Sequence, residues 1–347
     1  MGHTGWVWAQ FALCLALIGG AGFELARSGD RIARRTGLSS SWIGLGLVAT
    51  ITSLPELSSG ISAVTAAAAP DIAVGDALGS CVINLALLVV ADLLHRPETL
   101  YRRASASHVL SAGFGVILLG FVAFGLLVGK SAPSPGAQPG IAGLQTVLSL
   151  STPILLTLYV VALRSVFLHE RRRQVASTAG DDDQTASTGS LRRLALNFSV
   201  AAILVVSAGS MLPLLAVDLA EAMQWNRSFV GTLFVALATS VPELAVTVSA
   251  LRVGSLDLAV GNLLGSNLFN VAILAVDDLF YVGGPLLAEV SLAHAMTATT
   301  AVVMTGIAAV GLSYRPDNRV LRTVDAVSLG LLAMVVLNAC ALFVHGD

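Results

Sequence analysis

Long apolar runs separated by short polar segments make up most of the chain. Each run holds about twenty residues, enough for a helix to cross a hydrocarbon core of roughly 30 Å. The pattern predicts an all-α polytopic membrane protein with ten transmembrane helices. The predicted spans are residues 6–26, 43–69, 72–94, 107–129, 142–165, 194–217, 228–251, 256–281, 290–313 and 322–345.

Three connections organise these spans. Very short turns at Pro70–Asp71 and Gly254–Ser255 predict tight hairpins of spans two and three and of spans seven and eight. The polar stretch 169–193 predicts a disordered linker, because it holds too few apolar residues to pack. The predicted division is a first five-helix repeat at 1–168, this linker, and a second five-helix repeat at 194–347.

Composition supports the membrane class. Of 347 residues, 55% are apolar and 12% charged, and the mean hydropathy of +0.83 excludes an ordinary soluble protein. The net charge of −2 indicates no particular partner, and no basic patch with interleaved aromatic residues suggests nucleic acid. The expected partners are the lipid bilayer and, from the motifs described below, inorganic cations. The cysteines lie in predicted spans without the spacing of thiol ligands. The first apolar run lacks a basic leader and a cleavage site, so we expect it to be retained as a span.

The placement of Lys and Arg predicts the orientation. Of the 19 basic residues, all but Lys130 and Arg227 lie at odd-numbered connections. By the positive-inside rule, the linker is cytoplasmic and both termini lie outside a cell (inner) membrane. Because each half has an odd number of spans, the two halves cross the membrane in opposite directions. Inverted repeats are typical of secondary transporters, whose sites lie near the bilayer midplane.

Two polar motifs occur once in each half. T-S-L-P-E at 52–56 matches T-S-V-P-E at 239–243, and G-D-A-L-G-S-x-x-x-N at 75–84 matches G-N-L-L-G-S-x-x-x-N at 261–270. The offset is 187 residues for the glutamates (243 − 56) and 186 for the last asparagines (270 − 84). Such a constant register indicates an internal repeat.

The first motif places polar groups on one helix face. Thr52 and Glu56 are four residues apart, as are Thr239 and Glu243, so each pair points to the same side of its helix. The proline within each motif has no N–H and pushes against the carbonyl one turn back. We therefore expect both helices to be kinked, with freed carbonyl oxygens facing protein or water.

The second motif adds neutral oxygens. Ser80 with Asn84, and Ser266 with Asn270, are again four residues apart. The Gly-x-x-x-Gly pairs that precede them allow helices to approach closely. Carboxylate, hydroxyl and carbonyl oxygens together suit Ca²⁺ or Na⁺ rather than zinc or copper.

Two converging carboxylates, Glu56 and Glu243, carry the charge that one divalent cation neutralises. Without that cation, Na⁺ or protons must compensate, because two buried like charges at close range cannot both stay ionised. The residues therefore predict that different cations occupy the same carboxylates in turn.

Other polar residues of the spans are expected to have structural roles. His108 and His294 are isolated and lack an HExxH-like partner, which favours packing or interface positions over metal binding. Acidic residues near span ends are expected to be solvated at the membrane interface; these are Glu24, Asp92, Asp218, Asp277 and Asp278.

The paired motifs resemble the two alpha repeats of the sodium/calcium exchanger superfamily of cation/Ca²⁺ antiporters. The resemblance implies alternating access by sliding of spans one and six over the remaining core, with no cofactor and no enzymatic activity. It implies that Glu56 and Glu243 are the central ligands of Ca²⁺, Na⁺ or H⁺. The other implied ion-binding groups are the side chains of Thr52, Ser53, Ser80, Asn84, Thr239, Ser240, Ser266 and Asn270 and the carbonyls of Ala49 and Ala236.

The chain departs from the pattern of this superfamily at several positions. Ile51 and Ala238 stand where Gly usually precedes Thr-Ser, and a branched Ile51 is expected to narrow or reshape the site. Asp76 and Cys81 stand where Asn is common. Asn270 is neutral where several exchangers carry an acid, which leaves two central carboxylates and keeps H⁺ coupling open.

Two alternatives stay open beside an antiporter. One is a cation-binding relative with altered selectivity or lost transport, motivated by Ile51. The other is an intramembrane enzyme using the two glutamates as acid and base, although no nucleophile elbow, zinc motif or cofactor fingerprint accompanies them. The coupling ion, stoichiometry, direction of flux and oligomeric state do not follow from the sequence.

Overall fold

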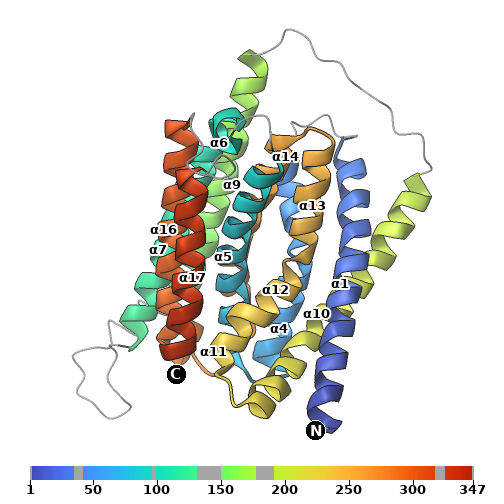
Figure 1. Cartoon of the computed structure of the whole chain (residues 1–347), viewed down its shortest axis with the longest axis vertical. Coiled ribbons are helices and arrows are strands. Elements are labelled where there is room, and N and C mark those ends of the chain that lie inside the picture. The colour runs from blue at the N-terminus through green and yellow to red at the C-terminus, as the bar shows by residue number, and fades with distance from the viewer. Residues whose placement is uncertain are drawn as a thin grey trace.

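The computed structural model describes residues 2–34, 42–95, 99–130, 150–176, 191–316 and 325–345. Within these ranges the secondary structure is helical, with no strand, and the long helices run side by side in one bundle (Figure 1). The long unbroken helices are α1 (Gly2–Arg34), α5 (Pro70–Leu94), α7 (Ser107–Lys130), α9 (Ser151–Ala176), α10 (Leu191–Met223), α14 (Leu256–Phe280), α16 (Ala293–Tyr314) and α17 (Ala326–His345).

Two further spans are broken near their middle. One consists of the π-helix η1 (Ile43–Val48), α3 (Ala49–Thr52) and α4 (Leu54–Thr65). The other consists of α11 (Arg227–Phe229), the π-helix η3 (Val230–Val235), α12 (Ala236–Thr239) and α13 (Val241–Arg252). With these two, the eight unbroken helices of the described ranges make up the ten predicted spans, arranged as two inverted five-helix repeats. The predicted fold class is confirmed.

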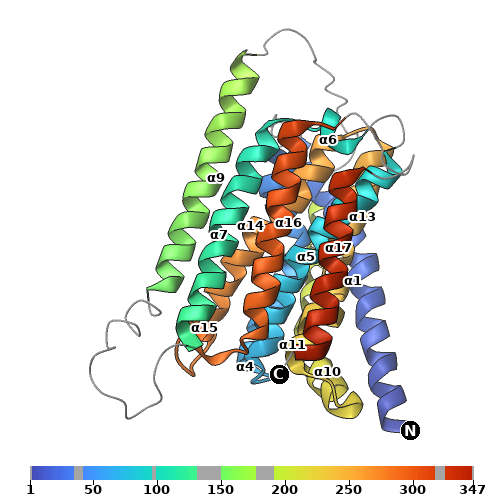
Figure 2. The same cartoon turned by 60° about the vertical axis from the view of Figure 1, so that its left-hand side comes forward.

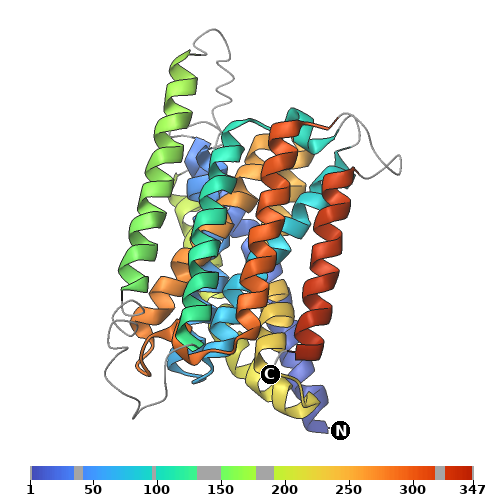
Figure 3. The ribbon, with the colours of Figure 1, turned by 90° about the vertical axis from the view of Figure 1, so that its left-hand side faces the viewer.

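The fifth span and the linker differ from the prediction. Helix α9 covers Ser151–Ala176 instead of 142–165, and residues 142–149 lie outside the described part of the chain. Residues 169–176, expected in the disordered linker, continue this helix, which extends beyond its neighbours (Figure 3). The charged residues here are good helix formers, so the helix persists after its apolar run ends. Likewise, α10 already begins at Leu191.

Helices α5 and α14 form the centre of the bundle. In their most apolar windows, 72% and 89% of residues are buried inside the protein, against 28% for α1 and 22% for α17. Helices α5 and α14 pack on each other and on the broken span of the opposite repeat. The polar motifs are therefore enclosed by protein on all sides, whereas the outer helices present their apolar faces to lipid.

Helices α1 and α10, the first helix of each repeat, pack along one another on one side of the bundle (Figure 1). Each also contacts a broken span of the opposite repeat through a glycine. A Cβ at Gly22 would lie 2.5 Å from Pro242, and a Cβ at Gly209 would lie 2.9 Å from the carbonyl oxygen of Pro55. These glycines bring the outer pair directly onto the prolines that follow the breaks.

Short helices at opposite ends of the bundle repeat the internal symmetry. They are α6 (Leu100–Arg103) and α15 (Leu286–Glu289), which lie 186 residues apart (286 − 100) and at opposite ends in Figure 2. Each begins at an N–H that donates to an aspartate, Asp92 at 2.9 Å and Asp278 at 2.6 Å. Asp92 is fully buried and also accepts from Ser328 at 3.1 Å, so the expected interface solvation is wrong for this residue.

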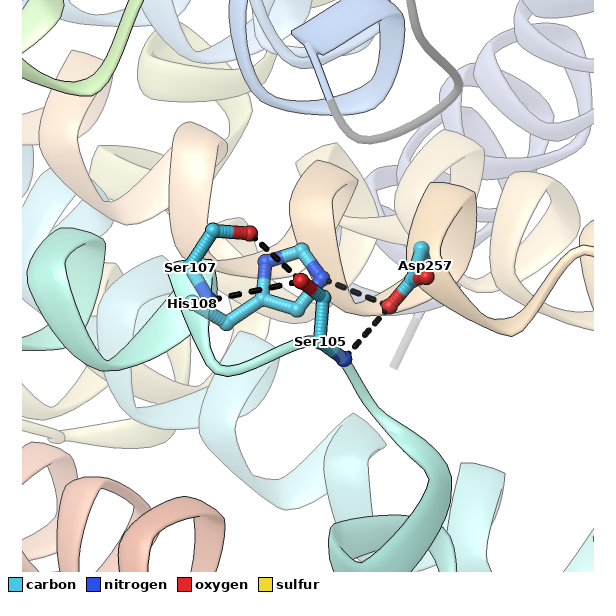
Figure 4. A network of polar contacts seen from close by, with 4 residues as sticks. All are labelled: Ser105, Ser107, His108 and Asp257. Atoms are coloured by element: carbon cyan, nitrogen blue, oxygen red, sulfur yellow. Dashed lines mark hydrogen bonds and ion pairs between the residues drawn. The ribbon is translucent and has the colours of Figure 1, made fainter. Parts of the chain in front are cut away.

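A contact between a histidine and an aspartate joins the two repeats. His108 Nε2 lies 3.1 Å from Asp257 Oδ1 at the tip of the α13–α14 hairpin, and the same oxygen accepts from the Ser105 N–H at 2.8 Å (Figure 4). The Ser105 and Ser107 hydroxyls are 2.8 Å apart beside it (Figure 4). His108 is buried, as expected for a packing residue, but its acidic partner comes from the other half of the chain.

The same arrangement occurs in the other repeat, 186 residues away. His294 Nε2 lies 3.1 Å from Asp71 Oδ1 at the tip of the α4–α5 hairpin, and this oxygen accepts from the Ser291 N–H at 2.7 Å. Each hairpin is thus fastened to the start of a helix of the opposite repeat, α7 in one case and α16 in the other. These contacts fix the core that carries the polar motifs.

Candidate cation-binding site

The two breaks lie at the serines of the T-S-x-P-E motifs. The helix axes bend by 43° between Ile43–Thr52 and Leu54–Thr65 and by 41° between Arg227–Thr239 and Val241–Arg252. The backbone at Ser53 (φ −87°, ψ 15°) leaves the helical region, and a proline follows in the first turn of the next helix, where its missing N–H is tolerated. The predicted kinks are confirmed. The π-helical turns before them are an addition that no sequence pattern indicated.

Each break starts a new helix with a glutamate in its first turn. Glu56 and Glu243 are 1% and 0% exposed, and the positive end of a helix dipole favours a carboxylate there. Their contacts cross between the repeats. Ser53 Oγ donates to Glu243 Oε1 at 2.9 Å, and Ser240 Oγ donates to Glu56 Oε1 at 3.4 Å. The two carboxylates therefore converge at the centre of the bundle.

Around Glu243 the first repeat and α14 supply further oxygens. Ser266 Oγ lies 3.2 Å from Glu243 Oε1 and 3.5 Å from the Ala49 carbonyl oxygen. Thr52 Oγ1 lies 3.2 Å from that carbonyl, 3.5 Å from Ser266 Oγ and 3.3 Å from Asn262 Oδ1. Carboxylate, hydroxyl, amide and backbone oxygens thus meet within one buried cluster.

The symmetric cluster contains an aspartate. Thr239 Oγ1 lies 3.2 Å from the Ala236 carbonyl oxygen, 3.4 Å from Ser80 Oγ and 2.9 Å from Asp76 Oδ1. Asp76 is 1% exposed and occupies the place that Asn262 has in the other repeat (262 − 76 is 186). A third acid, which the expectation of two central carboxylates did not include, therefore lies beside Thr239. One indication of this acid was present in the sequence, since Asp76 stands where Asn is common in the superfamily that the motifs resemble.

Glycines of the second motif bring the central helices onto the broken spans. A Cβ at Gly79 would lie 2.8 Å from Ala236 Cβ, and a Cβ at Gly265 would lie 2.8 Å from Ala49 Cβ. No side chain fits at either position without a shift of the neighbouring helix. The predicted role of these glycines in close helix approach is confirmed, and it places Ser80 and Ser266 against the segments that carry Ala236 and Ala49.

Several buried polar atoms of the cluster have no hydrogen-bond partner among the described residues. They are Glu56 Oε2, Glu243 Oε2 and Asp76 Oδ2; the amide atoms of Asn84 and Asn270, one helical turn beyond Ser80 and Ser266, also have no such partner. Unsatisfied buried polar atoms are costly, and three carboxylates that each keep one oxygen without a partner beside the same hydroxyls indicate a ligand site. Oxygens dominate this set, and the described residues hold no group of three His, Cys, Asp or Glu near enough to bind a metal alone. The chemistry fits a hard cation held mainly by neutral oxygens around the two glutamates.

Ile51 does not reach this cluster. It packs with Leu54 against Leu25 of α1 and Ala201 and Val205 of α10. The expectation that its branched side chain narrows the site is wrong, because the position preceding Thr-Ser faces the outer helix pair.

Comparison with known proteins gives the family. The family model described as "Sodium/calcium exchanger protein" matches residues 6–168 and 193–341. The chain belongs to the sodium/calcium exchanger family. It is 30% identical over 245 residues to the inner membrane protein YrbG of Escherichia coli, with 70% of each chain covered. It is also 29% identical over 285 residues to the sodium/calcium exchanger MaX1 of Methanosarcina acetivorans, covering 77% of this chain and 80% of that one.

Solved structures of the same family share the fold. The sodium–calcium exchanger NCX_Mj, in crystals soaked with Na⁺ and Sr²⁺, superposes with a TM-score of 0.62 at 22% identity, covering 97% of this chain and 99% of that one. This exchanger-family chain is therefore an integral membrane protein of a transporter family of cation/Ca²⁺ antiporters. The likeness to the solved structure concerns the arrangement of helices.

Proposed function

We propose that this protein exchanges Ca²⁺ for Na⁺ or H⁺ across the membrane, with the ions bound near the midplane by Glu56 and Glu243. One observation carries the proposal: glutamates from two inverted repeats meet in a buried cluster, and each keeps one oxygen without a partner among the described residues. Inverted repeats that meet at broken helices are the usual setting of transported ions.

The charges support exchange over simple binding. Ca²⁺ between Glu56 and Glu243 neutralises both carboxylates, and the Ser53 and Ser240 hydroxyls orient one oxygen of each. When Ca²⁺ leaves, an uncompensated pair of buried carboxylates is too costly to persist. Monovalent cations or protons must then enter, which couples the two fluxes through one set of oxygens. The remaining ligands are the hydroxyls, amides and two alanine carbonyls assigned from the motifs.

Helices α1 and α10 are the moving elements of the proposed alternating access. They pack on each other and approach the broken spans closely at Gly22, against Pro242, and at Gly209, against Pro55. Sliding of packed helices is one of the common forms of conformational change in proteins. Access to the glutamates then changes from one membrane face to the other while the core stays fixed.

The uneven distribution of Lys and Arg between the two sides and the name of one relative support a location and an orientation in the cell. We propose an inner (cell) membrane location, with the α9–α10 connection in the cytoplasm and both termini outside. The relative from Escherichia coli is named an inner membrane protein.

Transport by purified protein in liposomes tests the proposal. Glu56→Gln and Glu243→Gln should each abolish Ca²⁺ uptake driven by an outward Na⁺ or H⁺ gradient, whereas Asp218→Asn, which removes an exposed carboxylate of α10, should not. Uptake by both glutamine variants at the rate of the unmodified protein would refute the assignment.

A further inference from the structure

Asp277 is a buried acid that the exchange site does not use. It lies on α14 one residue before the partly exposed Asp278, and it was expected to be solvated at the interface. That expectation is wrong: Asp277 is 0% exposed. Neither of its carboxylate oxygens has a hydrogen-bond partner in the described ranges.

A glycine on α4, Gly60, leaves room for this carboxylate because it has no side chain. A Cβ at Gly60 would lie 2.6 Å from Asp277 Oδ1 and even closer to Oδ2. The internal repeat shows that this pairing is special to one half. The equivalent of Asp277 is Ala91 (277 − 186), and the equivalent of Gly60 is Thr247 (60 + 187). The carboxylate and the space for it thus occur together, on one side of the glutamates.

Asp277 lies between the exchange site and one end of the bundle. The titratable side chains that act on it electrostatically are Asp76, from α5, and Asp278, its neighbour on α14. Asp278 is partly exposed and accepts from the Leu286 N–H and the Thr152 hydroxyl. The symmetric route toward the other face has Asn262 and Ala91 in place of Asp76 and Asp277. The opposite end keeps only Asp92, the equivalent of Asp278 (278 − 186), so acids occupy all three positions only on the side that holds α15.

The buried Asp277 carboxylate has no hydrogen-bond donor in the described ranges, so one positive charge must neutralise it. An ionised carboxylate in such surroundings is strongly disfavoured unless a cation or proton neutralises it. Na⁺ or Ca²⁺ would need several oxygens around it, and no hydroxyl or amide among the described residues is within hydrogen-bonding distance of Asp277. A proton needs a single carboxylate oxygen, so the surroundings of Asp277 fit H⁺ and not a metal cation.

We propose that Asp277 is a proton-binding site of the exchanger, loaded from the membrane face at which α14 ends. In this step a proton from water joins one Asp277 oxygen, which converts the carboxylate to a neutral carboxylic acid; the reverse step returns the proton. Asn270 lies seven residues earlier on the same helix, about two turns or roughly 10 Å away. Ca²⁺ at the glutamates therefore favours release of this proton, and by linkage a protonated Asp277 weakens Ca²⁺ binding. This coupling rests on the proposed function, whereas the protonated state of Asp277 does not.

Infrared spectroscopy of the purified protein tests the site without relying on transport. The unmodified protein should show the C=O stretching band of a buried protonated carboxyl group. Asp277→Asn should lose this band. Asp278→Asn should keep it, and Gly60→Ala should shift it, because the added methyl group presses on the carboxyl. A band that is unchanged in Asp277→Asn, or lost equally in Asp278→Asn, would overturn the proposal.

Proton release on Ca²⁺ binding tests the coupling. In weakly buffered detergent solution with a pH indicator dye, the unmodified protein should release one more proton per Ca²⁺ bound than Asp277→Asn. Asp278→Asn should behave like the unmodified protein. Equal release by the unmodified protein and Asp277→Asn would refute the coupling. Failure of the unmodified protein to bind Ca²⁺ would refute the proposed function, while the infrared result would still decide whether Asp277 holds a proton.

Discussion

Replacing Gly265 by alanine tests how tightly the bundle is built around the cluster. The added Cβ would lie 2.7 Å from Leu45 Cα and 2.8 Å from Ala49 Cβ, and closer still to the Leu45 carbonyl oxygen. Two of these three atoms belong to backbone, so the clash cannot be relieved by turning a side chain. Either α14 or the broken span must move.

The size of the effect follows from two opposing terms. Overpacking of a well-packed core costs about 1–3 kcal/mol. Alanine gains about 0.5–1 kcal/mol over glycine within a helix. Gly265→Ala should therefore destabilise the protein by up to roughly 2.5 kcal/mol, the largest overpacking cost less the smallest gain in helix propensity. Because the shift displaces the Ala49 segment from Ser266, Ca²⁺ affinity should fall as well.

Thermal unfolding in detergent measures this change, with Gly306→Ala as the matched control. Gly306 lies within α16, and a Cβ there would meet nothing within 4 Å. The control should therefore unfold at the same or a higher temperature than the unmodified protein, and Gly265→Ala at a lower one. If both variants unfold alike, or if Gly265→Ala is the more stable, the close helix approach inferred here is wrong.

Three further predictions concern the site, the hairpin tips and the moving helices. Glu243→Gln should weaken equilibrium Ca²⁺ binding by about 2–5 kcal/mol, which titration calorimetry would record as a ~30- to ~4,000-fold loss of affinity. A change below about twofold would contradict the assignment. Asp257→Asn should lower the free energy of unfolding by about 1–2 kcal/mol in thermal unfolding, because His108 and the Ser105 N–H lose a charged acceptor. An unchanged unfolding temperature would show that the contact between His108 and Asp257 does not stabilise the bundle. Gly209→Ala should slow Ca²⁺ uptake into liposomes but leave equilibrium Ca²⁺ affinity unchanged, because its Cβ presses on the Ser58 hydroxyl and the backbone of Pro55, on the side of α4 that faces α10. Unaltered uptake would exclude sliding of α10 along this contact.

The apolar runs and the two motifs predicted most of the architecture. Span number follows from run length, and inversion follows from an odd number of spans in each half. The breaks follow from Pro55 and Pro242, since a proline cannot donate within a helix. The end of α9 could not be found this way, because hydropathy marks where a helix leaves the membrane and not where the helix stops.

Contacts between the two halves were beyond the sequence. His108 appeared isolated because Asp257, its partner, lies 149 residues away. Asp277 appeared to be an interface residue because it lies near a span end, and only the packing shows that Gly60 leaves room for it inside. Ile51 appeared to face the site because the motif does not show which side of the kinked helix turns toward α1 and α10.

Ca²⁺ uptake by the reconstituted, unmodified protein tests the central claim most directly. Liposomes loaded with Na⁺ and diluted into Na⁺-free medium containing radioactive Ca²⁺ measure Na⁺ coupling, and liposomes with an acidic interior measure H⁺ coupling. Uptake should depend on at least one of these gradients and should disappear in Glu243→Gln. Folded, Ca²⁺-binding protein that moves no Ca²⁺ under either gradient would contradict the proposed exchange.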